Sequence, residues 1–371
     1  MKVAIDVSSA AKADPTGIGR YIVELVRNLA PLLAPAGDRL RLMAAWKRRR
    51  DREHLAPLAA LPGVEGPALL LRWLPGLLMG GADLLHGTGL SLPAAVRAPA
   101  AVTIHDINTI DDPTLARDRT VARRAAKTAK VLRRADLVIV VAAFVRDRIL
   151  HHFPEFPADR IRVVHHGVDH AGLSPERGPG DAAVLARHGL GDGRPYVLFV
   201  GRVEHRKNPD GLVRGFARAA AAKEARLVFA GMKGRSSVED AIRETGIGER
   251  ARFLGRVEDA DLGPLYRGAA CFALPSRYEG FGIPLAEAFA CGAPALASNA
   301  TALPEVAGDA AELCAIEPEA IAAGLDRVLG DAERARALRE RGLARAREFT
   351  WRRCAERTLE AYRDLLRLGK R

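Results

Sequence analysis

Two glutamates flank a glycine-rich turn in the stretch SRYEGFGIPLAEAFACGAPALAS, residues 276–298. Glu279 comes directly before a Gly-Phe-Gly tripeptide, and Glu287 follows in a segment that Pro284 is suited to open as a helix. Carboxylates accept strong, charge-assisted hydrogen bonds, so each glutamate could bind a pair of hydroxyl groups on a sugar or a ribose. The alternative is structural: Glu287 would favour its helix dipole, by about 0.3–1 kcal/mol, and Glu279 would be a solvated loop residue.

The two glycines of this turn, Gly280 and Gly282, let the backbone bend tightly and approach a ligand closely. The helix that follows begins with unpaired backbone N–H groups, which form a favourable site for an anion. A site that binds a sugar and a phosphate together would gain from both features, and this is the first functional hypothesis.

A second stretch, LFVGRVEHRKNPDGL, places two cations after a predicted strand. Arg202 and Lys207 precede a helix that Asn208 and Pro209 can start. A helix dipole disfavours cations at its beginning, so two exposed bases would be misplaced there without an anionic partner. Two cations can neutralise a diphosphate leaving group where no metal ion does so. The stretch therefore predicts a diphosphate site.

Two weaker candidates lie in the first half of the chain. Gly17 and Gly19, in DPTGIGRYIVELV, precede an amphipathic helix, but Ile22 interrupts the G-x-G-x-x-G fingerprint of dinucleotide-binding turns. These glycines either allow a turn or contact a phosphate or an acceptor. His105, in TIHDINTIDDP, follows a strand, where a histidine is more often a packing or capping residue than a ligand-binding one.

Two further patterns are better explained by structural roles than by ligand binding. Asp259 and Asp261 resemble a metal-binding D-x-D pair, but their place at a helix start favours Asp259 as an N-cap, so we predict no metal site. The segment 117–134 predicts a helix with one basic side, formed by Arg123, Lys127, Lys130 and Arg134 opposite Val121, Ala125, Thr128 and Leu132. Such a side is usually solvated, but it can also contact anionic lipid.

Short apolar runs alternate with helix-like segments along almost the whole chain. The runs that are typical of buried strands are KVAIDV, RLRLMAA, LLHG, AVTIHD, LVIVV, IRVVH, YVLFVG, ARLVFAG, ARFLG, ACFALP and PALAS. This alternation predicts an α/β fold with two parallel sheets covered by helices. Residues 171–196 are richest in glycine and proline and predict the domain boundary. Ligands bind beyond the carboxyl ends of such strands, so we expect the site in a cleft between the domains.

Composition agrees with a two-domain globular protein. The chain has 371 residues, 48% of them hydrophobic and 27% charged, and a formal net charge of +12. This charge suits anionic partners such as nucleotides, diphosphates, acidic lipid or nucleic acid. Only 5% of the residues are aromatic and no stacking motif occurs, which disfavours a nucleic-acid-binding protein. Four cysteines without C-x-x-C spacing fit a reducing cytosol, and the apolar stretch 68–80 is too short and interrupted to span a membrane.

Together these stretches resemble a known family of enzymes. The run PSRYEGFGIPLAEAFACGAPALASNATALPEVAGDAA is similar to the signature region of the retaining glycosyltransferases of family 4, whose two glutamates are separated by seven residues as Glu279 and Glu287 are. VLFVGRVEHRKN resembles the donor-phosphate strand and loop of that family, and GIGRY, IHD and VVHHGVD match its acceptor-domain landmarks. One departure is Glu204-His205, where the family commonly has a small residue and proline.

The resemblance implies a GT-B fold, in which two Rossmann-like, doubly wound domains face a deep cleft. Residues 1–175 would form the acceptor-binding domain, completed by a C-terminal helix at about 350–371, and residues 190–349 the nucleotide-sugar donor domain. The implied reaction transfers a sugar from a nucleotide sugar with retention of anomeric configuration, without a metal or another cofactor.

The resemblance also implies roles for individual residues. Arg202 and Lys207 would bind the donor diphosphate, and Glu287 would bind the ribose hydroxyls. Glu279 would bind the hydroxyls of the donor sugar, together with three backbone amides, those of Gly280, Phe281 and Gly282. The two glutamates would thus bind opposite ends of one molecule. Catalysis by Arg202, Lys207 and Glu279 would consist of positioning and charge stabilisation rather than covalent chemistry.

In the first domain, the resemblance implies that His105 contacts the donor sugar near the anomeric carbon and that Gly17 or Gly19 approaches a phosphate or the acceptor. PTGIGRY with HDINTIDDPTL is most similar to GDP-mannose-dependent mannosyltransferases of bacterial surface-polysaccharide pathways. The expected partners are GDP-mannose and a glycan or polyprenyl-diphosphate-linked acceptor. The expected location is the cytoplasm, with peripheral contact of 117–134 at the inner face of the cytoplasmic membrane as an option. A UDP-sugar-dependent transferase, a sugar phosphorylase and an epimerase are the enzymatic alternatives.

Overall fold

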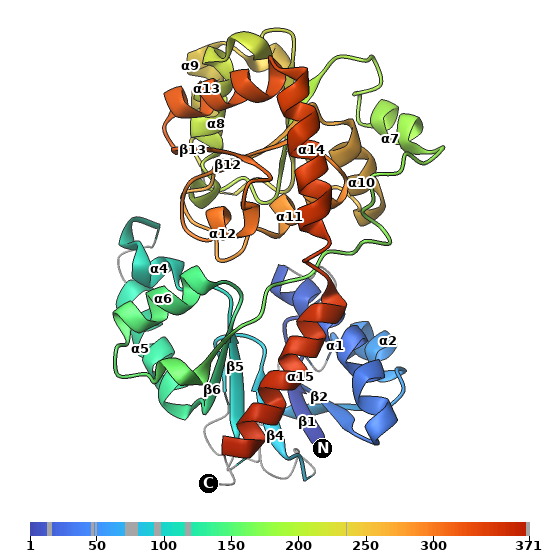
Figure 1. Ribbon diagram of the computed structural model, residues 1–371, viewed down its shortest axis with the longest axis vertical. Helices are drawn as coiled ribbons and strands as arrows, with labels where there is room; N and C mark the ends of the chain where they lie inside the picture. Colours follow the sequence, from blue (N-terminus) through green and yellow to red (C-terminus); the bar gives the residue numbers. More distant parts are fainter. Residues whose placement is uncertain are drawn as a thin grey trace. The chain divides into compact units, whose positions relative to one another are not determined.

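The chain folds into two compact units in a computed structural model (Figure 1). The structure describes residues 1–12, 17–45, 48, 50–70, 81–92, 98–115, 120–234 and 236–368, so most of the apolar stretch 68–80 and the start of the basic segment 117–134 lie outside it. Unit 1 comprises Met1–Gly167 and Trp351–Arg371, and unit 2 comprises Val168–Thr350.

Unit 1 ends at Gly167 rather than at residue 175, ahead of the glycine- and proline-rich segment. That segment belongs to unit 2 because it contains a short helix, α7 (Asp181–Arg187), that is anchored there by ion pairs. Arg267 of helix α10 (Asp259–Gly268) donates to the Asp181 carboxylate at 2.7 Å. A segment rich in turn residues is therefore not a free linker here.

Unit 1 is built on a seven-stranded parallel sheet in the order β3-β2-β1-β4-β5-β6-β7. Its strands are β1 (Lys2–Asp6), β2 (Arg39–Ala45), β3 (Val64–Leu70), β4 (Leu84–Gly87), β5 (Ala100–Ile104), β6 (Leu137–Val140) and β7 (Ile161–Val163). β4, β5 and β6 are buried at every position, which explains their uninterrupted apolar runs. The strand order reverses between β1 and β4, as in a doubly wound fold.

Helices from both ends of the chain complete unit 1. They are α1 (Gly17–Leu33), α2 (Ala56–Ala59), α4 (Asn108–Asp111), α5 (Thr120–Arg134), α6 (Ala143–His152) and α15 (Trp351–Leu368). The last helix, α15, packs against α1, and Figure 1 shows the two side by side. Leu25 and Leu29 of α1 share one core with Tyr362 and Leu365 of α15. Helix α15 is therefore part of the core of unit 1.

Unit 2 contains a six-stranded parallel sheet in the order β10-β9-β8-β11-β12-β13. Its strands are β8 (Tyr196–Val200), β9 (Arg226–Ala230), β10 (Ala251–Gly255), β11 (Cys271–Leu274), β12 (Ala295–Ser298) and β13 (Glu312–Cys314). Besides α7, its helices are α8 (Pro209–Arg218), α9 (Val238–Thr245), α10 (Asp259–Gly268), α11 (Ile283–Ala290), α12 (Leu303–Ala307), α13 (Pro318–Leu329) and α14 (Ala332–Ala346). Phe199, Phe216 and Phe229 lie in its core.

The strand order of unit 2 reverses between β8 and β11, which are hydrogen-bonded neighbours. The loops after these two strands therefore leave the sheet at the same edge and side by side, although they are far apart in the sequence. They are the loops that carry Lys207 and Glu279. The predicted fold class, two Rossmann-like parallel sheets with helices, is confirmed.

Candidate active site

The loop after β8 depends on a glycine and on an asparagine with unusual backbone angles. Gly201 has φ +127°, and a Cβ at this position would lie only 3.1 Å from Cε of Lys207. The short 3₁₀ helix η6 (His205–Lys207) follows, and Asn208 then adopts φ 56° before α8 begins at Pro209. The Asn208 amide donates to the carbonyl of Ile316 at 2.8 Å, which holds this rare conformation. These backbone angles bring the Lys207 side chain back beneath Gly201.

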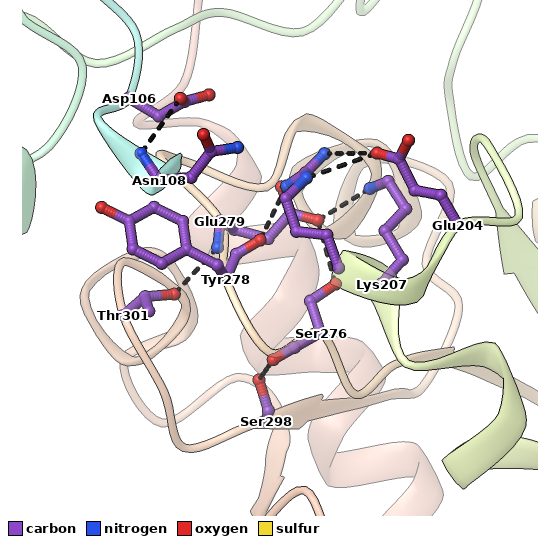
Figure 2. Close-up of polar contacts among 10 residues, drawn as sticks. Asp106, Asn108, Glu204, Lys207, Ser276, Tyr278, Glu279, Ser298 and Thr301 are labelled. Atoms are coloured by element: carbon purple, nitrogen blue, oxygen red, sulfur yellow. Dashed lines mark hydrogen bonds and ion pairs between the residues drawn. The ribbon is translucent and has the colours of Figure 1, made fainter. Parts of the chain in front are cut away.

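Lys207 and Glu279 form a buried ion pair between the two loops (Figure 2). The Nζ of Lys207 donates to Oε1 of Glu279 at 2.7 Å, and both side chains are 8% exposed. The hydroxyl of Ser276 donates to the same oxygen at 2.9 Å, and Thr301 accepts a hydrogen bond from the backbone N–H of Glu279 at 3.0 Å. Glu279 is therefore not a solvated loop residue, which removes the structural alternative for it.

Arg206 is a member of this cluster that the sequence did not indicate. Its Nη1 donates to Oε2 of Glu279 at 2.9 Å and to the carbonyl of Tyr278 at 2.6 Å. A 3₁₀ turn is tight, so the neighbours Arg206 and Lys207 can both reach one carboxylate. The only signal in the sequence was the adjacency of the two cations, and adjacent side chains often point apart.

Burial and charge act in opposite directions on Glu279. Burial raises the pKa of its carboxyl, but the Arg206 and Lys207 cations and their hydrogen bonds outweigh burial and lower the pKa to about 2. Glu279 is therefore ionised at neutral pH and has hydrogen-bond donors on both oxygens.

Glu287 lies on α11, on the helix that the glycine-rich turn opens. It is 4% exposed and accepts a hydrogen bond from the hydroxyl of Tyr266, on α10, at 3.0 Å. The first turn of α11 contains no acidic residue, so Glu287 lies beyond the reach of the favourable helix dipole. The structural alternative for Glu287 therefore fails as well.

The residues between the two glutamates shape the start of α11. Gly282 has φ +94°, and a Cβ there would lie 2.6 Å from the Leu303 side chain, so glycine is required for both reasons. Gly280 is buried, and Phe281 packs edge-on against Phe349 with ring centroids 5.4 Å apart. Arg202, by contrast, is 67% exposed and lies 3.9 Å from Glu204, its partner in the same loop. The structure thus brings together Lys207 and Glu279 and leaves Arg202 exposed.

In unit 1, Gly17 and Gly19 are the first and third residues of α1 rather than a special turn. Neither glycine has a positive φ; Gly17 is exposed and Gly19 is buried. The interpretation that these glycines merely allow a turn is therefore wrong, because both lie within α1 and neither has a backbone angle that requires glycine. Contact with a phosphate or an acceptor stays a prediction.

His105 follows β5, as predicted, and both of its ring nitrogens have partners within unit 1. Nε2 lies 3.0 Å from the carbonyl of Thr88, and Nδ1 lies 3.3 Å from Nε2 of His166. A carbonyl only accepts, so Nε2 of His105 carries the proton and its Nδ1 accepts from His166. Burial lowers the pKa of both histidines, despite the hydrogen bond to Thr88 and the charge of Asp106 at His105. His105 is a neutral, oriented imidazole.

A buried hydrogen-bonded chain connects this region of the sheet to the last helix. Tyr21 bonds to Thr103 at 3.0 Å, Thr103 bonds to His86 at 2.8 Å, and His86 bonds to Tyr362 of α15 at 2.7 Å. The Tyr21 ring also packs against His105, with centroids 4.8 Å apart. None of these contacts was predicted, because they join distant segments that only the fold brings together.

Comparison with known proteins identifies the family. Residues 15–171 match the family model described as Glycosyltransferase Family 4, and residues 183–345 match the one described as Glycosyl transferases group 1. The chain belongs to the family 4-like GT-B glycosyltransferases. The two matches follow the order of the two units and, together, cover most of the chain.

Characterised relatives of this glycosyltransferase differ in their named activities. O-antigen chain mannosyltransferase B of Escherichia coli is 36% identical over 244 residues, 63% of this chain and 62% of the relative. D-inositol 3-phosphate glycosyltransferase of Nocardia farcinica is 38% identical over 217 residues, 55% of this chain and 47% of the relative. These alignments span less than two thirds of the relatives' own lengths.

Solved structures of the GT-B type resemble this glycosyltransferase over nearly its whole length. Sucrose-phosphate synthase from Thermosynechococcus elongatus has a TM-score of 0.77 at 22% identity and covers 99% of both chains. The Anabaena protein HepE, in complex with UDP and glucose, has a TM-score of 0.75 at 18% identity, with 98% of this chain and 100% of that chain covered. At such identities the likeness shows the fold alone, and it confirms the GT-B prediction.

Two other sequence interpretations change in the structure of the glycosyltransferase. Asp259 is the first residue of α10, and the N-cap is Glu258, so the N-cap prediction for Asp259 is wrong by one residue. Asp261 is paired with Arg187 at 2.5 Å and His188 at 2.8 Å, both near α7. In the part of the chain that the structure describes, no three His, Cys, Asp or Glu side chains gather as metal ligands would.

The basic side of α5 also differs in composition from the prediction. Thr128 and Leu132 are buried as expected, but Arg134 is half-buried and donates to the carbonyl of Ala98 at 3.0 Å. The exposed cations of the helix are Arg123, Arg124, Lys127, Lys130 and Arg133. Among the helices within the described ranges, none has the length and apolar character needed to cross a bilayer.

Proposed function

We propose that this glycosyltransferase moves a hexose, mannose, from a nucleotide-diphosphate sugar to a glycan or lipid-linked acceptor, with retention of anomeric configuration. The observation that carries the proposal is the buried Lys207–Glu279 pair at the reversal of strand order in unit 2, where open parallel sheets bind their ligands. The similarity to an O-antigen chain mannosyltransferase supports mannose as the transferred sugar and GDP-mannose as the donor.

Each residue of the cluster has a proposed contact with the donor. Lys207 and the exposed Arg202 would neutralise the diphosphate, and the buried carboxylate of Glu279 would accept a hydrogen bond from a sugar hydroxyl. Glu287, which Tyr266 holds by one oxygen, would bind the ribose hydroxyls. The backbone amides of Gly280, Phe281 and Gly282 would lie beside the donor sugar.

The proposed reaction takes place on one face of the sugar. The bond between the anomeric carbon and the diphosphate oxygen breaks, and its electron pair goes to the diphosphate, which the Lys207 and Arg202 cations stabilise. The acceptor hydroxyl bonds to the same face of the anomeric carbon and gives its proton to the departing diphosphate oxygen. His105 would contact the sugar as a neutral ring and would not take this proton, since its nitrogens already have partners. No step requires a metal or a cofactor.

The donor is tested by a panel of GDP-, UDP- and dTDP-sugars. We expect GDP-mannose to give the largest thermal stabilisation and the fastest release of nucleoside diphosphate in the presence of acceptor. A ligand at a hundredfold excess over its Kd stabilises the folded state by about 2.7 kcal/mol, so the preferred donor should stand apart. Release that requires inorganic phosphate would indicate a phosphorylase, and conversion of the nucleotide sugar without release would indicate an epimerase.

A UDP-sugar is the second candidate donor. It is supported by the likeness of the fold to a protein that was solved with UDP and glucose. A larger stabilisation by UDP-glucose than by GDP-mannose in the same panel would replace the first candidate with the second.

The exposed basic face of α5 would contact anionic lipid, which suits a lipid-linked acceptor at a cytoplasmic membrane surface. We expect the protein to float with vesicles that contain phosphatidylserine, not with neutral vesicles, and to be released by salt. Each cation near such a surface contributes about 1 kcal/mol, so the double substitution Arg123→Glu and Lys130→Glu should weaken flotation at least tenfold. Arg352→Glu and Arg357→Glu on α15 reverse two other exposed charges and serve as the control. Equal loss in both proteins, or no flotation, would exclude this face as a lipid contact.

A further inference from the structure

Five charged side chains of alternating sign connect the two loops of the candidate site. Each of these side chains is paired with the next, in the order Arg202, Glu204, Arg206, Glu279 and Lys207. The N···O distances of the four successive pairs are 3.9, 3.3, 2.9 and 2.7 Å. Glu204 stands where the family commonly has a small residue, so this departure supplies the carboxylate that joins Arg202 to Arg206. The proposal below rests on the proposed function.

Burial increases along this row of charges. The side chain of Arg202 is 67% exposed, that of Arg206 is 22% exposed, and those of Glu279 and Lys207 are each 8% exposed. A buried carboxylate that loses its cation carries a large desolvation cost. The cost of separating Lys207 from Glu279 therefore depends on whether another cation stays with Glu279.

Donor binding makes conflicting demands on this pair. Lys207 has a single ammonium group, which donates to Glu279 here and is needed by the diphosphate when the donor binds. Both oxygens of Glu279 have donors here, and one must become available to a sugar hydroxyl. Both demands are met if Lys207 turns from Glu279 to the diphosphate and the carboxylate keeps its place.

We propose that Arg206 is a positioning residue that neutralises and orients Glu279 while Lys207 turns from Glu279 to the donor diphosphate. One guanidinium nitrogen of Arg206 bonds both the Glu279 carboxylate and the Tyr278 carbonyl, so it fixes the side chain and the adjacent backbone together. Glu204 holds Arg206 from the other side, at 3.3 Å. The exchange frees the acceptor position on Oε1 of Glu279 that Lys207 occupies, so that a sugar hydroxyl can bind there while the Ser276 hydroxyl keeps its own bond to this oxygen.

The test measures nucleoside diphosphate binding, with GDP and UDP as probes, in the wild type and four variants. In Arg206→Met the release of Lys207 would leave Glu279 without a cation, so we expect affinity to fall at least tenfold. In Glu279→Gln, Lys207 no longer has to leave a charged carboxylate before it contacts the diphosphate. The affinity should therefore stay within threefold of the wild-type value or increase. The double variant should bind like Glu279→Gln, because the carboxylate that needed Arg206 is gone. Arg206→Lys should restore part of the affinity.

Two results would overturn the proposal. Wild-type affinity in Arg206→Met would show that Arg206 is not needed for the exchange. Affinity of the double variant as low as that of Arg206→Met would show that Arg206 contacts the diphosphate itself. Arg243→Met removes an arginine that is paired with Asp240 at the same distance of 2.9 Å but is 76% exposed, and it should bind like the wild type.

A measurement without donor separates this proposal from the proposed function. If the wild type binds neither GDP nor UDP, the proposed function fails, and the hold of Arg206 on Glu279 is still tested by carboxyl carbon NMR. The Glu279 signal is assigned as the one lost in Glu279→Gln. We expect its titration midpoint to rise by at least one pH unit in Arg206→Met, since Lys207 and the Ser276 hydroxyl would then be the remaining partners of the carboxylate among the described residues. An unchanged midpoint would contradict the positioning role.

Discussion

Replacement of Lys207 by alanine is expected to lower turnover at least 100-fold while the protein stays folded. The loss follows because the ammonium group neutralises the diphosphate as the glycosidic bond breaks, and one such preorganised contact commonly contributes a factor of 100 to 1,000. The fold should survive because Glu279 keeps the Arg206 guanidinium and the Ser276 hydroxyl as partners. The measurement is the initial rate of nucleoside diphosphate release at saturating donor, with circular dichroism to check folding.

The control for this variant is Lys223→Ala. Lys223 is exposed and precedes β9, so it lies at the opposite end of the sheet from the loops that carry Lys207 and Glu279. Its replacement should leave the rate within twofold of the wild type. Turnover of Lys207→Ala within threefold of the wild type would mean that Lys207 has no part in stabilising the leaving group.

The sequence predicted the interior strands of both sheets and missed one edge strand in each. β3 was missed because Gly66 and Pro67 interrupt its apolar run, and β13 because it has only three residues, Glu312–Cys314. Interior strands are buried on both faces and so have continuous apolar runs, whereas edge strands tolerate proline and polar residues. The missed strands are therefore those for which the physical constraint on composition is weakest.

For the site, the sequence predicted single residues better than their partners. Lys207 and Glu279 were assigned to different parts of one ligand, and the structure shows that they first bind each other. Arg206 and His166 were missed because each acts through a contact with a residue that is distant in the sequence. Periodicity and local spacing carry no information about such contacts, since only the packing of the fold creates them.

The same limit applies to side-chain states. The pattern IHD places His105 at the end of a strand, but its tautomer follows from the carbonyl of Thr88 and from His166, which are remote in the chain. Likewise, the sequence does not tell whether an ion pair of Glu279 would lie on the surface or in the interior. On the surface such a pair would contribute little to stability. Burial of the Glu279 side chain, which is 8% exposed, makes the interaction strong and its loss measurable.

Substitution of Glu279 by glutamine is expected to lower turnover at least 100-fold and to remove part of the acid sensitivity of the fold. The amide keeps the size of the side chain but cannot give the donor sugar a charge-assisted hydrogen bond. Because Lys207 is released, nucleoside diphosphate should still bind, so the loss should appear in kcat and not in binding. Circular dichroism at pH 7 should confirm a folded protein, although Arg206 and Lys207 then lack their anion and stability should be lower.

The pH dependence follows from the low pKa of Glu279. Its ordinary value is 4.5, burial alone would raise it, and the Arg206 and Lys207 cations bring it to about 2. A carboxyl with a depressed folded-state pKa stabilises the fold fully above its ordinary pKa, and this contribution is lost as the pH falls toward 2. The shift corresponds to about 3 kcal/mol. Urea unfolding should therefore show the stability advantage of the wild type over Glu279→Gln decreasing by about this amount between pH 6 and pH 2.

The matched control is Glu239→Gln, which removes a carboxylate paired with Lys233 at the same distance of 2.7 Å but 57% exposed. Exposed pairs contribute between about 0 and 1 kcal/mol, so this variant should follow the wild type at every pH. A constant difference between the wild type and Glu279→Gln from pH 6 to pH 2 would mean that the buried carboxylate is not held ionised by its two cations. The arrangement of Arg206, Lys207 and Glu279 would then have to be revised together with the roles assigned to them.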